Sequence, residues 1–118
     1  MKVEFLPSTV GTLATKQFCI SAVINDTIAI DAGSIGLLWP VERQMQIQQI
    51  FLSHSHLDHV ASLPLFLDNI YRRGPDCPSV YACEATIKCL REMFSTTGCG
   101  RTSFDCPEKN LRFWNFRR

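Results

Sequence analysis

The sequence lacks an excess of charge of either sign. Twelve lysines and arginines stand against 11 aspartates and glutamates, which leaves a formal net charge of +1 among 118 residues. Proteins that bind nucleic acid or anionic membranes through surface charge concentrate basic residues, and this chain contains no charge block. The composition therefore argues against both classes, whereas a phosphate-bearing substrate stays compatible with it because bound metal ions supply positive charge locally.

Long hydrophobic runs are also missing. No stretch approaches the roughly 20 apolar residues that a membrane-spanning helix requires. The apolar run at residues 3–6 ends at Pro7 and is too short for the core of a signal peptide. We therefore expect a soluble, cytoplasmic protein with no membrane partner.

The six cysteines include no C-x-x-C pair, which argues against a zinc ribbon. Reduced thiols in a cytosolic protein are the simplest interpretation of their spacing. Cys83 and Cys89 fall in or beside one predicted helix, and we expect them to line the core. A weaker alternative makes Cys99 and Cys106 zinc-binding thiolates.

Short apolar segments and turn signals organise the chain. The hydrophobic fraction of 46% fits one folded domain or a piece of one. Apolar and β-branched runs predict strands at residues 3–6, 18–24, 27–30, 49–53, 79–82 and 111–116, with Asn25-Asp26 as a hairpin turn. Pro40 marks the start of one predicted helix. Amphipathic spacing predicts two more, at residues 60–71 and 84–94. Strands followed by alternating helix and strand are typical of an α/β layered domain.

All three histidines fall in the segment Ser53-His54-Ser55-His56-Leu57-Asp58-His59. Alternate residues of a strand point the same way, so His54 and His56 can present imidazoles to one ion. We expect the chain to bend after Leu57, so that Asp58 and His59 reach a neighbouring position. Four ligand-type side chains at one strand-to-helix junction favour two adjacent metals, the arrangement that activates water and clamps both oxygens of a phosphoester displacement.

The H-S-H-L-D-H motif after an apolar strand resembles the signature of the metallo-β-lactamase superfamily, and Asp31-Ala32-Gly33 matches the Asp-x-Gly found upstream of it. By this resemblance, His54 and His56 are ligands of the first metal, while Asp58 and His59 are ligands of the second. Asp58 is also expected beside the nucleophilic water, as the catalytic residue. Asp31 is expected to orient a ligand from behind, with a simple turn aspartate as the alternative.

The implied cofactor is a pair of divalent metal ions. Zinc is the first choice, and manganese or iron are alternatives because histidine and carboxylate ligands suit all three.

Two groups within the superfamily share the motif. Residues 30–34, 53–59, 63–69 and the strand and helix from residue 80 resemble the class II cyclic-nucleotide phosphodiesterases and their bacterial relatives, and the resemblance covers most of residues 1–95. Ribonuclease Z also carries S-H-x-H-x-D-H but usually continues with Gly-Leu, where this chain has Ala61-Ser62-Leu63. The resemblance thus implies hydrolysis of a small phosphodiester such as a cyclic nucleotide, with an RNA-processing nuclease as the alternative.

The sequence departs from the family after the motif. The family adds two further histidines and a bridging aspartate downstream, whereas this chain has no histidine after His59. The family fold is an αββα sandwich of two similar halves, and a chain of 118 residues provides for the first half only. We therefore expect residues 1–118 to form a partial metallo-β-lactamase-like domain from a truncated product or fragment.

An isolated first half would bind metal weakly, because two imidazoles hold an ion less tightly than three. It would also leave one sheet face and an edge strand unpaired. We expect homo-oligomers and little or no turnover from the chain alone. The alternative function is a catalytically inactive domain that acts by self-association or by binding a partner.

Overall fold

The protein is described by a computed structural model that covers residues 1–7, 19–71, 78–95 and 111–113. Its centre is one six-stranded sheet in which the strands lie in the order of the chain. The strands are β1 (Val3–Phe5), β2 (Ala22–Ile24), β3 (Ile28–Ile30), β4 (Gln49–Phe51), β5 (Ser79–Ala82) and β6 (Leu111–Phe113). With the helices described below, this arrangement confirms the predicted α/β class. Every predicted strand has a counterpart within these ranges, and the strands at residues 3–6, 27–30 and 49–53 are shorter than expected. Residues 18 and 114–116 of the predicted strands lie outside the described residues.

The sheet is mixed. β1, β2 and β3 pair in antiparallel fashion, whereas β3, β4, β5 and β6 run parallel. Residues 25–27 join β2 to β3, and Asn25 and Asp26 have φ angles of 50° and 61°. Positive φ at both central residues suits a hairpin turn of type I′, and asparagine and aspartate tolerate it better than most residues. The predicted hairpin turn is therefore confirmed.

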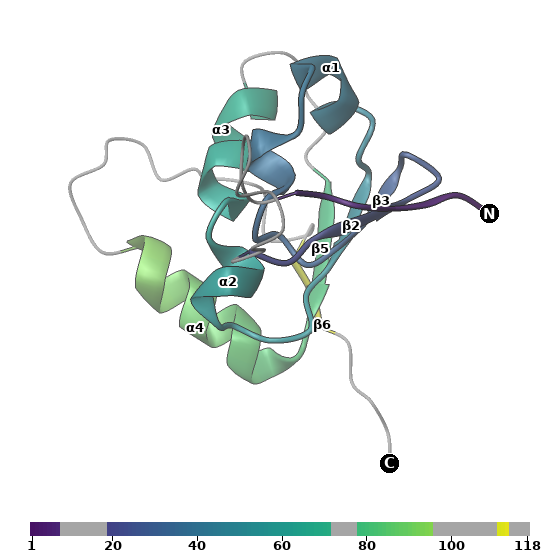
Figure 1. Ribbon diagram of the computed structural model, residues 1–118. Helices are drawn as coiled ribbons and strands as arrows, with labels where there is room; N and C mark the ends of the chain where they lie inside the picture. Colours follow the sequence, from purple (N-terminus) through teal and green to yellow (C-terminus); the bar gives the residue numbers. More distant parts are fainter. Residues whose placement is uncertain (8–18, 72–77, 96–110, 114–118) are drawn as a thin grey trace.

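The helical elements lie on one side of the sheet (Figure 1). They are the 3-10 turn η1 (Ile35–Leu37) and the α-helices α1 (Val41–Gln44), α2 (Leu57–Val60), α3 (Leu63–Tyr71) and α4 (Glu84–Ser95). None of the helices within the described ranges is both long enough and apolar enough to cross a membrane.

The sheet has one covered face and one open face. The middle residue of each inner strand is buried, as with Ala29 and Ile50, and packs in the same core as Phe66 of α3. The alternate residues Ile30, Phe51 and Tyr81 are only half-buried. In the part of the chain that the structure describes, no helix covers this second face (Figure 1). The period of two in a strand thus separates a complete core from an apolar surface.

The helix predicted at residues 60–71 is wrong in its beginning and its continuity. Helix formation starts inside the motif, at Leu57, and the chain breaks at Ala61-Ser62 before α3 begins. The backbone N–H of Ser62 donates to the carbonyl of Ala32 at 3.0 Å instead of continuing α2. Pro64 has no N–H with which to bridge the break. Asp58 and His59 consequently lie on the single turn of α2 and not in the predicted bend.

Candidate metal centre

The motif lies where neighbouring parallel strands end. Asp31 follows β3, Ser53 and His54 follow β4, and Cys83 follows β5. The parallel register pairs Ile30 with Phe51 and Phe51 with Tyr81, so these three strand ends are level. Carboxyl ends of parallel strands form the edge at which α/β proteins place their binding sites.

His54 and His56 form the first pair of donor atoms. Nε2 of His54 lies 3.0 Å from Nδ1 of His56, and their ring centroids are 4.5 Å apart. Two nitrogens at zinc–nitrogen bond lengths of 2.0–2.1 Å and a tetrahedral angle stand roughly 3.3 Å apart. The separation in this pair is therefore close to that of two ligands on one ion.

Asp58 and His59 form a second pair. Oδ2 of Asp58 lies 3.4 Å from Nε2 of His59, whose other nitrogen, Nδ1, lies 2.8 Å from Oδ2 of Asp31. Because the Asp31 carboxylate can only accept a hydrogen bond, Nδ1 of His59 donates it. In the neutral imidazole, Nε2 then carries a lone pair that faces the Asp58 carboxylate. Two acceptors so close to each other require a proton or a cation between them.

The two pairs are in contact. The rings of His54 and His59 lie 4.0 Å apart between centroids, at an interplanar angle of 51°. The four predicted ligands are thus gathered at one place, two and two. As the side chains lie, no group of three or more histidine, cysteine, aspartate or glutamate residues in the described ranges is arranged to hold a metal ion. Imidazoles and carboxylates are donors that divalent metals accept, so the chemistry of this set is compatible with the predicted pair of ions.

The carboxylate of Asp31 holds this cluster from behind. It is 4% exposed and accepts the backbone N–H of Ser53 at 2.8 Å and the Ser53 hydroxyl at 2.8 and 2.9 Å, besides the His59 ring. Asp31 has a φ of 58°, in the left-handed region that aspartate tolerates better than most residues. Hydrogen bonds to a charged group each contribute about 1.5–3 kcal/mol. Asp31 therefore contacts His59, one of the four predicted ligands, while the binding of a metal by His59 stays a prediction.

Backbone hydrogen bonds join the Asp31-Ala32-Gly33 turn to the motif. Ala32 N–H donates to the His59 carbonyl at 2.6 Å, and Ile20 N–H donates to the Asp58 carbonyl at 2.7 Å. Gly33 N–H donates to the Ile20 carbonyl at 3.1 Å, which closes the connection. A Cβ on Gly33 would overlap the Asp58 carbonyl oxygen and lie 2.6 Å from Ile20 N. Only glycine permits this approach of three backbone segments.

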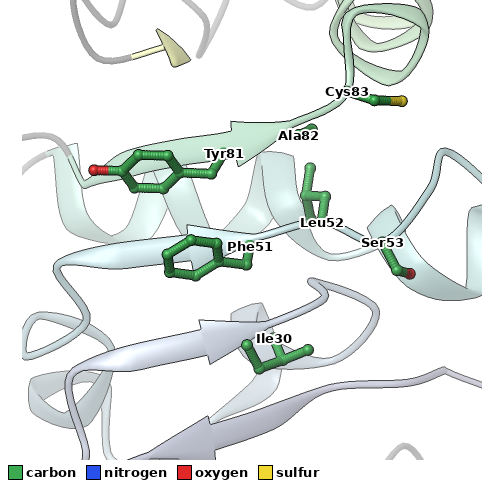
Figure 2. Close-up of a pocket in the computed structure, with 7 residues that line it drawn as sticks. All are labelled: Ile30, Phe51, Leu52, Ser53, Tyr81, Ala82 and Cys83. Atoms are coloured by element: carbon green, nitrogen blue, oxygen red, sulfur yellow. The ribbon is translucent and has the colours of Figure 1, made fainter. Parts of the chain in front are cut away.

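An apolar cleft on the open face of the sheet ends at the motif. It has a volume of about 330 Å³ and is lined by Ile30, Phe51, Leu52, Ser53, Tyr81, Ala82 and Cys83. Figure 2 shows the rings of Phe51 and Tyr81 side by side, with Ser53 and Cys83 toward the other end. These two rings stack at 4.7 Å between centroids.

The expectation that Cys83 and Cys89 line the core is wrong. Cys83 is exposed and Cys89 is partly exposed. Cys83 immediately precedes α4, where its carbonyl accepts the N–H of Ile87 and its thiol lies 3.2 Å from the Thr86 hydroxyl. The Thr86 hydroxyl, and after it the backbone N–H of Thr86, lowers the pKa of the Cys83 thiol. Cys99 and Cys106 lie outside the described residues.

Sequence reasoning missed two residues of the site. Ser53 was part of the motif but received no role, although its hydroxyl contacts Asp31, His54 and His59. Gly33 was recognised only as part of Asp-x-Gly, although it is the point of closest backbone approach. For Ser53, the only signal in the sequence is its place directly before the first histidine of the motif.

Comparison with protein-family models found no matching family, and comparison with curated proteins found no match. The resemblance to the metallo-β-lactamase superfamily therefore rests on the motif and on the chemistry of the residues around it.

Replacement of Gly33 by alanine tests the backbone approach behind the motif. We expect Gly33→Ala to lower the free energy of unfolding by about 2 kcal/mol, because the added methyl overpacks a fixed backbone junction. The change should appear as a lower midpoint in urea unfolding. Ala61→Ser, which adds one atom at an exposed position nearby, should stay within about 0.5 kcal/mol of the parent. Equal midpoints for the two variants would contradict the account of this junction.

Proposed function

We propose that this chain carries part of the binuclear metal site of a phosphodiester hydrolase of the metallo-β-lactamase type. The observation that supports this function is the contact between two donor pairs, His54 with His56 and Asp58 with His59, at the carboxyl ends of parallel strands. A surface loop with unrelated histidines has no reason to direct four ligand atoms to one place, nor to bury an aspartate behind them.

Two divalent ions, when bound, provide a nucleophile at neutral pH by lowering the pKa of water and neutralise charge on the phosphoryl oxygens. The residues of the chain do the rest. Asp31 fixes the ring of His59. Nε2 of His54 and Nδ1 of His56 would together hold one of the two ions. The side chain of Asp58 is 45% exposed, so it can orient the attacking water and accept its proton.

A small phosphodiester such as a cyclic nucleotide is the substrate class that we propose. Among the described residues, Lys2 lies 2.8 Å from Asp26, Arg43 lies 2.6 Å from Glu4, and Lys88 lies 4.0 Å from Glu92. These basic side chains face acidic partners, and the net charge is only +1. An RNA substrate needs a basic surface along its backbone, so the low net charge of the sequence favours the small substrate over the ribonuclease Z-like alternative.

The small number of histidines predicts weak metal binding by the chain alone. All three of its histidines are already in the two pairs, so any further nitrogen ligand from histidine must come from outside these 118 residues. Zinc centres that catalyse reactions usually have three protein ligands on an ion. We therefore expect slow phosphodiester hydrolysis by the isolated chain.

Zinc binding to variants tests the proposal. Isothermal titration should place zinc on the motif, and the double variant His54→Ala/His56→Ala should weaken binding by at least about 100-fold, more than loss of an outer partner usually costs. Cys83→Ser is the matched control, because it removes an exposed thiol at the end of the neighbouring strand β5 and leaves the imidazoles intact.

Two outcomes would overturn the proposed function. One is zinc affinity that survives in the double histidine variant, and the other is affinity that disappears in Cys83→Ser. In the zinc-loaded protein, Asp58→Asn should retain affinity for one ion and lose hydrolysis of bis(p-nitrophenyl) phosphate. Unchanged hydrolysis in this variant would remove Asp58 from the catalytic role.

The open sheet face favours a second function, which is association with another copy of the chain. The apolar side chains of Ile30, Phe51 and Tyr81 stand on this face without a second layer among the described residues. Two such faces can pack about 10 Å apart in the manner of a sandwich.

Light scattering at increasing protein concentration tests this association. We expect a dimer for the parent chain and a monomer for Phe51→Thr, which removes an aromatic ring on the inner strand β4 from this face. Leu65→Thr is the matched control, because Leu65 is also an exposed apolar residue but lies on α3, on the opposite side of the sheet. A parent chain that stays monomeric, or a Leu65→Thr variant that dissociates equally, would exclude the open face as the contact.

A further inference from the structure

Ser53 occupies the junction between the buried carboxylate and the two donor pairs. Its Oγ lies 2.8 and 2.9 Å from the two carboxylate oxygens of Asp31, 2.9 Å from Nδ1 of His54 and 3.2 Å from Nδ1 of His59. Its backbone N–H also donates to Asp31 at 2.8 Å. This serine thus touches one imidazole of each donor pair and the carboxylate behind them.

The number of protons at this junction determines the direction of each hydrogen bond. A serine hydroxyl has one proton to donate and two lone pairs to accept with, whereas an ionised carboxylate can only accept. The Ser53 proton therefore goes to Asp31. The hydroxyl then has no second proton to donate to Nδ1 of His54. Nδ1 must therefore carry a proton of its own and donate it to Ser53 Oγ. His59 gives its own Nδ1 proton to Asp31, at 2.8 Å.

We propose that Ser53 is a positioning residue that fixes His54 in the tautomer with its proton on Nδ1. Nε2 of His54 then carries a lone pair, and this is the nitrogen that lies 3.0 Å from Nδ1 of His56. The carboxylate of Asp31 thereby sets both histidines, His59 directly and His54 through the serine hydroxyl. The binding of a metal ion by the Nε2 lone pair of His54 rests on the proposed function. The tautomer of His54 does not depend on it.

Long-range proton–nitrogen correlation spectra of the metal-free protein test this inference. They should be recorded at pH 8.5, where histidines with an ordinary pKa of about 6.5 are neutral. We expect His54 to show the Nδ1–H tautomer in the parent chain and in Ser53→Thr, which keeps the hydroxyl. In Ser53→Ala, His54 should shift toward the Nε2–H tautomer, which a histidine side chain in water prefers.

Ser55→Ala is the matched control, because Ser55 stands between the same two histidines and its hydroxyl is not part of the junction. It should leave the tautomer unchanged. Zinc affinity should fall about 10- to 100-fold in Ser53→Ala, the usual effect of losing the partner behind a ligand, and recover in Ser53→Thr. Backbone amide spectra of each variant show that the fold is retained.

The outcomes separate this inference from the proposed function. A His54 that keeps the Nδ1–H tautomer in Ser53→Ala, or a Ser55→Ala variant that loses it equally, overturns the role of Ser53. A parent chain that binds no zinc at the motif, but whose His54 changes tautomer in Ser53→Ala, overturns the metal site and supports the role of Ser53.

Discussion

The carboxylate of Asp31 is the interaction on which the candidate site depends. It is buried directly after β3, and it accepts hydrogen bonds from the Ser53 backbone, the Ser53 hydroxyl and the His59 ring. A buried carboxylate is costly unless its oxygens are satisfied, so these partners cannot be removed without penalty. Each partner belongs to the motif that follows β4. The carboxylate therefore couples the ends of two strands and orients the imidazoles that lie above it.

This coupling extends through the backbone. The turn that carries Asp31 is bonded to the carbonyls of Asp58 and His59 through Ile20 and Ala32, with Gly33 at the point of closest approach. The second donor pair is thus anchored twice, by a side chain and by its own main chain. Under the proposed function, such anchoring would hold the ligands in place before an ion binds and would lower the entropic cost of binding it.

Much of this arrangement could be predicted from sequence because its signals are local. The alternation of apolar residues located the strands, and Asn25-Asp26 located the hairpin turn. The order of histidines and aspartate predicted a set of four ligands; these four side chains lie together in the structure, and their binding of a metal stays a prediction. The break between α2 and α3 could not be predicted, because it depends on a hydrogen bond from Ser62 to Ala32, thirty residues away in sequence. The junction at Ser53 was missed for the same reason, since the carboxylate that directs its proton comes from another strand.

The open sheet face and the small number of predicted ligands both indicate that this unit needs a further protein surface. The sheet has helices on one side only within the described ranges, and the donor pairs hold two ligands each. Under the proposed function, both features suit a unit whose open sheet face and metal coordination are completed by further protein surface, from a second copy or from another segment. A unit of this kind can have a well-formed motif and still be a weak catalyst by itself.

Anomalous diffraction at the zinc edge, from crystals of the chain grown with zinc, tests the central claim most directly. The account predicts two neighbouring zinc peaks at the motif, one between Nε2 of His54 and Nδ1 of His56 and the other between Asp58 and Nε2 of His59. Nδ1 of His59 should remain on Asp31. Zinc bound only by cysteines, or imidazoles that have turned away from Asp31 with no metal between them, would contradict it.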